Sequence, residues 1–461
     1  MIGKTTTACA WSLVFLIALV LPAAGEERAE FPLEEYCPFG TNKFLRGQVA
    51  HCAKEPDADV MKYPAFVSTA PLYGKVAFGG KWDDAKAGVT HHFAIDESGG
   101  AGKGYDTFYF DLNRNLDLTD DPVVAPMKKE PAGAKFNWHQ AKGTVFFDYI
   151  NVPFDYGAPI GVRDFPVMPR FTFFEKDSQG LVSFVSPVAR RGKIVIGGRE
   201  ADIALGQENV ITGRFDKLGI TTQLAGEGWW WGVDTLRAMR FVDGKWYRLS
   251  TTPLGDKLFV EPYTGDMGLL TAGAGGREVK ELGMSGSLES SDSCLQVGPV
   301  KEGEMESPQS VSEWALPAGD YRPTLISVTV GRLSVQISYN YHSDGKPRER
   351  LGRAPVYGIK IRKDKPFAFD FSNPPDVMFA SPAKSQTFKP GDTVAVSGIL
   401  VDPIQDFMIR GLVDTGRKEQ KEYKDDSGRT SSYEESVSLD AKVTIRDSAG
   451  NAVAEGKMPF G

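Results

Sequence analysis

Short β-favouring segments bounded by turn residues recur along the chain from residue 70 onward. Clear examples are residues 105–110 (YDTFYF), 239–250 (MRFVDGKWYRLS) and 443–454 (VTIRDSAGNAVA). Asp-Gly between two apolar runs is a strong hairpin signal, because this dipeptide suits the positive φ angles of the turn. The 50 glycines and 29 prolines show no short period, which fits many turns and excludes collagen. With no long amphipathic helix pattern, the sequence predicts a mainly β protein and one short helix near residues 57–63.

The chain length requires several hydrophobic cores, since 461 residues exceed what one ordinary core holds. We interpret the first 25 residues as a targeting segment and the remainder as multidomain β-sandwich or β-barrel-like lobes. The expected units are an N-terminal β-rich lobe (26–190), a second β lobe that resembles a degenerate repeat of the first (191–272), a middle β domain (273–373) and a C-terminal Ig-like or fibronectin-like sandwich (374–461). Within the last unit, the charged, Ser-rich stretch 417–435 predicts a mobile insertion.

The N-terminus has the three parts of a signal peptide. Lys4 supplies positive charge, residues 11–21 (WSLVFLIALVL) are apolar, and residues 22–25 (PAAG) are small enough for cleavage. The apolar run is shorter than the ~20 residues that cross a bilayer. We therefore predict cleavage and export to the periplasm, the cell surface or the medium, with no later transmembrane segment.

Charge narrows the range of partners. Removing residues 1–25 removes Lys4 alone among the charged residues, so 53 Lys+Arg become 52 against 60 Asp+Glu, a net charge of −8. An acidic surface argues against nucleic acid or anionic lipid as the main partner and is compatible with divalent cations. A cell-envelope or extracellular polymer is the candidate macromolecular partner. Of the remaining cysteines, Cys37 and Cys52 are predicted either to form a disulfide or to stay free, and Cys294 is expected to be buried.

One loop collects oxygen-bearing side chains at alternate positions. Calcium takes 6–8 oxygen ligands, so a short segment that curls around one point is the arrangement it needs. The candidate ligands are Asp111, Asn113, Asn115, Asp117, Asp120 and Asp121. A metal-free turn rich in Asp and Asn is the alternative, because both residues favour turns without any ion.

Over about 12 residues this loop resembles the calcium loops of EF-hand and dockerin proteins. The resemblance places Asp111, Asn113 and Asn115 at the first, third and fifth ligand positions. It places Asp117 at the seventh, where the family uses a backbone carbonyl, and Leu118 at an apolar anchor position. Asp120 or Asp121 would replace the closing bidentate carboxylate. Two departures matter: Leu116 stands where the family has Gly, and Pro122 stands at the twelfth position. We expect a strand-borne, EF-like loop with a structural calcium ion rather than an EF-hand pair.

Much of the chain also resembles uncharacterised secreted bacterial β-rich proteins. The similar parts are residues 104–121, 241–249 (FVDGKWYRL), 316–321 (LPAGDY) and the C-terminal hairpin. This resemblance implies secretion and a β fold, and it implies no activity.

No other motif in the sequence points clearly to catalysis. HExxH and CxxC are absent, and adjacent His91 and His92 on a strand would face opposite sides, which disfavours a shared zinc ion. Trp229–Trp231 with Trp246 and Tyr247 predict either a sugar-stacking surface or core packing, with core packing favoured. The favoured hypothesis is an exported, non-enzymatic, modular β protein with a structural calcium loop and a role in adhesion or the cell envelope. The alternative is a secreted carbohydrate-active hydrolase or carbohydrate-binding protein with a cleft lined by carboxylates and Trp.

Overall fold

A computed structural model of the 461-residue protein describes most of the chain. The described residues are 28–41, 43–79, 88–134, 143–174, 179–217, 219–224, 235–276, 282–299, 312–338, 357–382, 386–389, 391–405, 407–424 and 430–458. The predicted signal peptide (1–25) and Trp229–Trp231 lie outside these residues.

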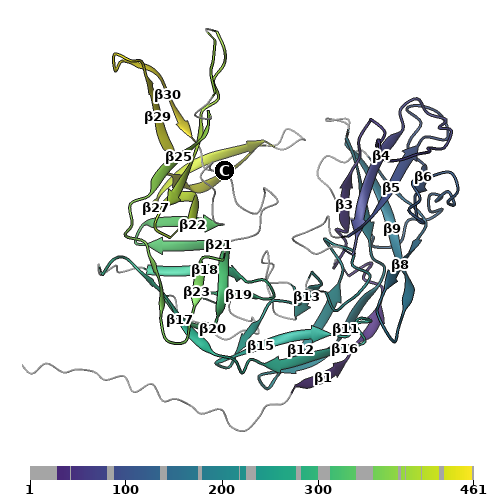
Figure 1. Ribbon diagram of the computed structural model, residues 1–461, viewed down its shortest axis with the longest axis horizontal. Coiled ribbons are helices and arrows are strands. Elements are labelled where there is room, and N and C mark those ends of the chain that lie inside the picture. Colours follow the sequence, from purple (N-terminus) through teal and green to yellow (C-terminus); the bar gives the residue numbers. More distant parts are fainter. Residues whose placement is uncertain are drawn as a thin grey trace, which may run out of the picture.

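The described residues form strands β1 to β30 and contain no helix, which confirms the mainly β, multi-lobed prediction. The short helix expected near residues 57–63 is wrong, because this segment runs as turns and an isolated bridge against a neighbouring loop. In Figure 1 the sheets follow a curve with two arms. The N-terminal strands form one arm, the C-terminal strands form the other, and β11, β12, β15 and β16 lie at the base between them.

The N-terminal arm is a sandwich of two antiparallel sheets. One sheet contains β3 (Gln48–His51), β10 (Gln179–Val185), β9 (Val162–Phe174), β7 (Gly143–Phe146) and β8 (Ile150–Asp155). The other contains β4 (Leu72–Phe78), β5 (Val89–Asp96) and β6 (Thr107–Phe110). Because side chains alternate along a strand, Phe93 and Phe108 point inward, where both contact Phe184 of the facing sheet. The opposite face of β4–β5–β6 presents Tyr73, Ala94 and Tyr109, which a loop layer covers.

Two four-stranded sheets form the base. β2 (Glu34–Tyr36), β11 (Ala189–Ile196), β12 (Arg199–Gly206) and β13 (Thr221–Leu224) form one; β1 (Ala29–Pro32), β16 (Lys257–Pro262), β15 (Lys245–Thr251) and β14 (Arg240–Val242) form the other. Strands β1 and β2 thus join the sheets of the second expected lobe, and one hydrophobic core extends from Leu33 to Val260. The predicted division at residues 190/191 therefore does not coincide with a break between sheets.

The C-terminal arm is built on a nine-stranded sheet. Its strands are β18 (Leu282–Glu289), β19 (Cys294–Val297), β21 (Gly319–Val330), β22 (Leu333–Ser338), β23 (Ile359–Ile361), β25 (Asp376–Ser381), β26 (Ser397–Asp402), β27 (Phe407–Lys424) and β28 (Thr430–Ser438). Strands β17 (Met267–Gly273), β20 (Glu313–Pro317) and β24 (Phe367–Asp370) form a small sheet, with β17 parallel to β24. Strands β29 (Ala441–Arg446) and β30 (Ala452–Met458) pair only with each other among the described strands.

The nine-stranded sheet crosses the predicted division at 373/374, since β22 pairs with β27. Where the predicted mobile insertion at 417–435 is described, it forms a hairpin in which β27 and β28 pair from Lys418–Ser436 to Lys424–Thr430. Cross-strand contacts between polar side chains accompany this pairing: Lys421 Nζ lies 2.7 Å from Glu435 Oε2, and Gln420 Nε2 donates to Glu434 Oε1 (3.0 Å). The side chains of the hairpin are mostly exposed.

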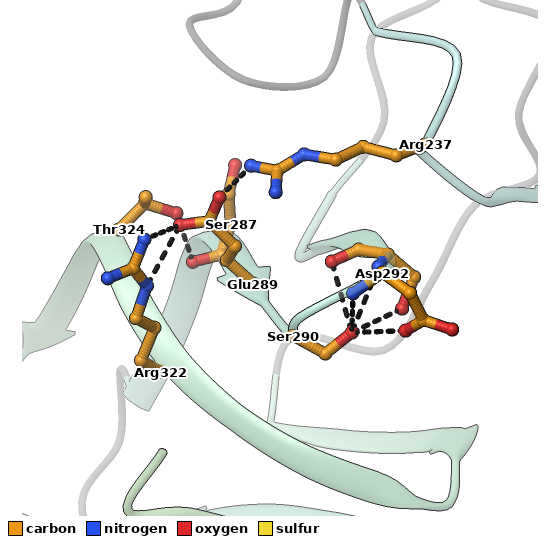
Figure 2. A network of polar contacts seen from close by, with 8 residues as sticks. Arg237, Ser287, Glu289, Ser290, Asp292, Arg322 and Thr324 are labelled. Atoms are coloured by element: carbon orange, nitrogen blue, oxygen red, sulfur yellow. Dashed lines mark hydrogen bonds and ion pairs between the residues drawn. The ribbon is translucent and has the colours of Figure 1, made fainter. Parts of the chain in front are cut away.

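A buried ion network connects the base to the C-terminal arm (Figure 2). Glu289 on β18 is 2% exposed. Arg322 on β21 donates to its Oε2 atom through Nε (3.0 Å) and Nη2 (2.7 Å), and Arg237, from the chain before β14, forms an ion pair with Oε1. A buried carboxylate is stable only when it is paired, so this network fixes how the two parts meet.

Candidate metal-binding loop

The acidic loop begins where strand β6 ends. Asp111 follows Phe110 directly and is fully buried. Its backbone N–H donates to the carbonyl of His92 (2.9 Å), and its own carbonyl accepts a hydrogen bond from Nδ1 of His91 (2.8 Å). The His91 ring stacks on Phe110 with centroids 5.0 Å apart, and burial lowers its pKa, so the imidazole is neutral with the proton on Nδ1. These contacts fix the start of the loop on the edge of the sheet.

Successive side-chain oxygens then curl the backbone around Asp111. The two carboxylate oxygens of Asp111 accept the backbone N–H groups of Asn115 (3.1 Å) and Leu116 (3.2 Å). Asn113 Oδ1 accepts the N–H of Asn115 (2.9 Å), and Asn115 Oδ1 accepts that of Asp117 (2.8 Å). Each is an Asx turn, the local motif that makes Asp and Asn frequent in tight loops.

Leu116 adopts a positive φ of 66°, and Arg114 adopts one of 61°. Leu116 occupies the position where EF-hand loops have Gly, and its positive φ is the conformation for which that position favours Gly. A left-handed conformation costs a non-glycine residue about 1–2 kcal/mol. The surrounding hydrogen bonds hold Leu116 in this conformation despite the cost.

Asp120 and Asp121 close the loop. Asn115 Nδ2 donates to Asp120 Oδ2 (2.6 Å), and Asn113 Nδ2 donates to both Asp120 oxygens (3.3 and 3.4 Å). The backbone N–H of Leu112 donates to Asp121 Oδ2 (3.1 Å). Burial, followed by the negative charges of Asp120 and Asp111, raises the pKa of Asp121 above its usual range. The closing carboxylates therefore lie near Asp111, and the repulsion between them is unfavourable.

Asp117 points differently from the other five candidates. Its carboxylate accepts from the backbone N–H of Thr119 (2.8 Å) and from Lys62 Nζ (3.2 Å). The Thr119 hydroxyl, more than any other group, holds the pKa of Asp117 below its usual range. These partners engage the side chain outside the loop centre, which fits a position that contributes its backbone carbonyl.

The loop is anchored on the outer face of β4–β5–β6. Leu118 is 1% exposed and packs with Tyr73 and Ala94. The carbonyl of Leu116 accepts the N–H groups of Met61 (2.9 Å) and Lys62 (3.2 Å), and Leu118 donates to the carbonyl of Lys62 (3.0 Å). The segment 57–66 and the acidic loop thus form one continuous layer over the sheet.

A second group of ligand-type side chains lies between this layer and β5 of the sheet. Asp57, Asp59 and His92 bring one carboxylate or imidazole atom each within 4.8 Å of one another. Sequence reasoning missed this group because it assigned residues 57–63 to a helix and considered His92 only together with His91. The two histidines do face opposite sides of β5, as expected from alternation along a strand.

Other acidic residues near the loop have structural roles. Asp96 accepts the N–H groups of Val67 (2.6 Å) and Ser68 (3.1 Å), and Glu97 accepts those of Gly102 (2.8 Å) and Gly104 (2.7 Å). Both residues lie at the end of the β5–β6 hairpin away from Asp111. Glu97 fixes the Gly-rich turn, Asp96 fixes residues 67–68 before β4, and neither contributes to the acidic loop.

The aromatic and cysteine residues singled out in the sequence include three that are buried, Trp246, Tyr247 and Cys294. Trp246 and Tyr247 are buried, and Trp246 Nε1 donates to the carbonyl of Ala315 (2.9 Å), so core packing is correct for both. Cys37, Cys52 and Cys294 are all free thiols, and Cys294 is buried as expected. Burial raises the pKa of Cys52 to about 12.

A scan against protein-family models gives no match, and searches of curated proteins and of solved structures find none that is similar. Among the residues that the structure describes, no helix has the length and apolar character needed to cross a membrane.

Proposed function

We propose that this chain is an exported, non-enzymatic, modular β protein whose N-terminal arm is stabilised by a structural calcium ion in the loop Asp111 to Asp121. Its role is adhesion or a function in the cell envelope. The signal-peptide pattern of residues 1–25 supports export, and the connected sheets support a binding or spacer role.

The observation that supports calcium best is the environment of Asp111. Its carboxylate is fully buried and accepts two backbone N–H groups, and the carboxylates of Asp120 and Asp121 close the same loop. Burying a charged group without a counter-ion is unfavourable, and like charges add to that cost. A carboxylate oxygen has two lone pairs, so it can accept an N–H group and still bind a cation.

The ligand set fits a hard cation. Asp111, Asn113 and Asn115 offer side-chain oxygens, Asp117 offers its carbonyl, and Asp120 or Asp121 closes the shell. In this structure the side-chain amides of Asn113 and Asn115 donate hydrogen bonds to Asp120. A bound calcium ion would replace these amides as the partner of that carboxylate. Trp246 and Tyr247 are buried and so do not form a sugar-stacking surface, and Trp229–Trp231 lie outside the described residues. The carbohydrate-active alternative is therefore not the function that we propose.

Calcium titration by calorimetry tests the proposal, together with thermal melting in calcium and in EDTA. The full chain is expected to bind calcium in this loop, and the double variant Asp111→Ala, Asn113→Ala is expected to lose that site. At a calcium concentration of 100 Kd the ion stabilises the folded protein by about 2.7 kcal/mol, so EDTA should lower the melting temperature.

A matched control is available in the C-terminal hairpin. Asp447 accepts the N–H groups of Ala449 (2.9 Å) and Asn451 (2.8 Å), so this turn has the same local chemistry without clustered carboxylates. The double variant Asp447→Ala, Asn451→Ala should bind calcium like the parent. Equal calcium uptake by the Asp111→Ala, Asn113→Ala variant would refute the proposal.

A further inference from the structure

The imidazole of His92 lacks the hydrogen bonds that a buried polar group normally makes. Its side chain is 8% exposed, and neither ring nitrogen has a hydrogen-bond partner. Leaving a buried polar group unsatisfied costs about 1–3 kcal/mol. His91, its neighbour on the opposite face of β5, differs in that its Nδ1 donates to the carbonyl of Asp111 (2.8 Å).

His92 is directed toward two carboxylates. Its Nε2 atom lies 3.7 Å from Asp57 Oδ2, and Asp59 completes a group whose ligand atoms all lie within 4.8 Å. Two ligands of a tetrahedral zinc ion, each about 2.0–2.2 Å from the metal, lie roughly 3.3–3.6 Å apart. The observed separation of His92 and Asp57 is close to that value.

The ammonium group of Lys75 lies beside the carboxylates of Asp57 and Asp59. Lys75 is directly opposite His92 in the pairing of β4 with β5, so both side chains leave the same face of the sheet. Lys75 Nζ lies 2.7 Å from Asp57 Oδ2 and 4.0 Å from Asp59 Oδ2. The Lys75 side chain is 52% exposed, so it can turn into solvent without disturbing the core.

We propose that Asp57, Asp59 and His92 form a binding site for a divalent transition-metal ion of the zinc type, and that Lys75 occupies it when the metal is absent. One imidazole nitrogen with two carboxylate oxygens suits zinc and its neighbours, whereas calcium prefers oxygen ligands alone. The Asp59 side chain is 73% exposed, which gives the ion a path from solvent and leaves the fourth position to water.

This site is independent of the calcium proposal, but the two share a scaffold. The segment that provides Asp57 and Asp59 continues into Met61 and Lys62, whose N–H groups donate to Leu116 of the acidic loop. A metal ion bound to Asp57, Asp59 and His92 would tie this segment to β5. It would thereby stabilise the acidic loop, which is hydrogen-bonded to the same segment.

The test is a zinc titration of the full chain against a chromophoric chelator, with calcium in excess. It is done in a Cys37→Ser background, because Cys37 is an exposed free thiol and a thiolate is itself a ligand for zinc. Cobalt(II) in place of zinc reports imidazole and carboxylate coordination through its visible absorption. We expect one zinc ion whose affinity falls at least 10-fold in Asp59→Asn and is lost in His92→Gln. We expect Lys75→Met, which removes the competing ammonium group, to bind zinc about 10-fold more tightly.

Two variants keep the test decisive. Asp59 is largely exposed, so Asp59→Asn should fold normally even if His92→Gln does not. His51→Gln alters an exposed histidine on β3 and should leave zinc affinity unchanged. The proposal is overturned if the parent binds no zinc, or if Asp59→Asn and His92→Gln bind it like the parent. Zinc binding that survives Asp111→Ala, Asn113→Ala and is lost in His92→Gln separates this site from the calcium loop.

Discussion

The replacement Leu118→Ala tests whether this side chain anchors the acidic loop to the sheet. Leu118 is 1% exposed and packs with Tyr73 and Ala94, while the neighbouring Val60 and Tyr63 are only partly buried. Truncating a buried Leu to Ala costs about 2–5 kcal/mol, and the larger values belong to rigid surroundings. The half-open layer around Leu118 can partly collapse, so we expect a cost of about 2–3 kcal/mol, at the lower end of the Leu→Ala range.

This cost should appear locally, because the loop opens without unfolding the whole chain. The N–H of Leu118 donates to Lys62, and those of Met61 and Lys62 donate to Leu116, so amide exchange at these residues reports opening of the layer. A loss of 2–3 kcal/mol corresponds to exchange that is about 30- to 150-fold faster in the peptides covering the loop and segment 57–66. Hydrogen–deuterium exchange with mass spectrometry, carried out in EDTA, measures this change without any contribution from metal.

The control is Val123→Ala. Val123 is 53% exposed just after the loop, and an exposed substitution changes stability by less than about 0.5 kcal/mol. If Leu118→Ala accelerates exchange no more than Val123→Ala does, Leu118 is not the anchor and the layered arrangement of the loop is wrong.

Three further outcomes are expected elsewhere in the molecule. Iodoacetamide should label Cys37 in the folded protein and spare Cys52, because burial raises the pKa of Cys52 to about 12. Intact mass before and after reduction checks this outcome. A native protein with no reactive thiol would contradict it. Burial raises the pKa of Glu208, so the folded protein holds the carboxyl proton more tightly than the unfolded chain does. The free energy of unfolding therefore falls as the pH rises from the unfolded-state pKa through the higher folded-state pKa. Glu208→Gln should therefore raise the melting temperature at neutral pH and have no such effect at about pH 3, where both states are protonated. An equal shift at both pH values would exclude this cause. Glu289→Gln leaves the buried Arg322 and the partly buried Arg237 without their counter-ion and should lower stability by about 3–5 kcal/mol, seen as an earlier calorimetric transition. An unchanged transition would show that the network is not needed.

The β class of the fold could be predicted from local chemistry. The aromatic, β-favouring residues of 105–110 and the Asp-Gly turn at 243–244 specify a strand and a hairpin by themselves. How the strands are shared between sheets could not be predicted. Strand β1 pairs with β16, more than 200 residues later, and this register depends on side chains that no local pattern connects.

The candidate loop was predictable because its chemistry lies within a dozen consecutive residues. The curl of the backbone at Leu116 follows from the Asx turns of Asn113 and Asn115. The group of Asp57, Asp59 and His92 was not predictable, since its members are joined only when the segment before β4 folds over β5. The Asp-x-Asp spacing at 57–59 was the available signal, and a helix assignment concealed it.

The most direct test of the central claim is a crystal structure of the full chain grown with calcium. We predict one calcium ion in the acidic loop, about 2.3–2.6 Å from oxygens of Asp111, Asn113 and Asn115 and from Asp120 or Asp121. The Asn amides should then turn their oxygens toward the ion and release Asp120. A structure grown at saturating calcium that shows no ion in the loop, with Asn115 still donating to Asp120, would contradict this prediction. It would show that the loop is a metal-free Asx turn.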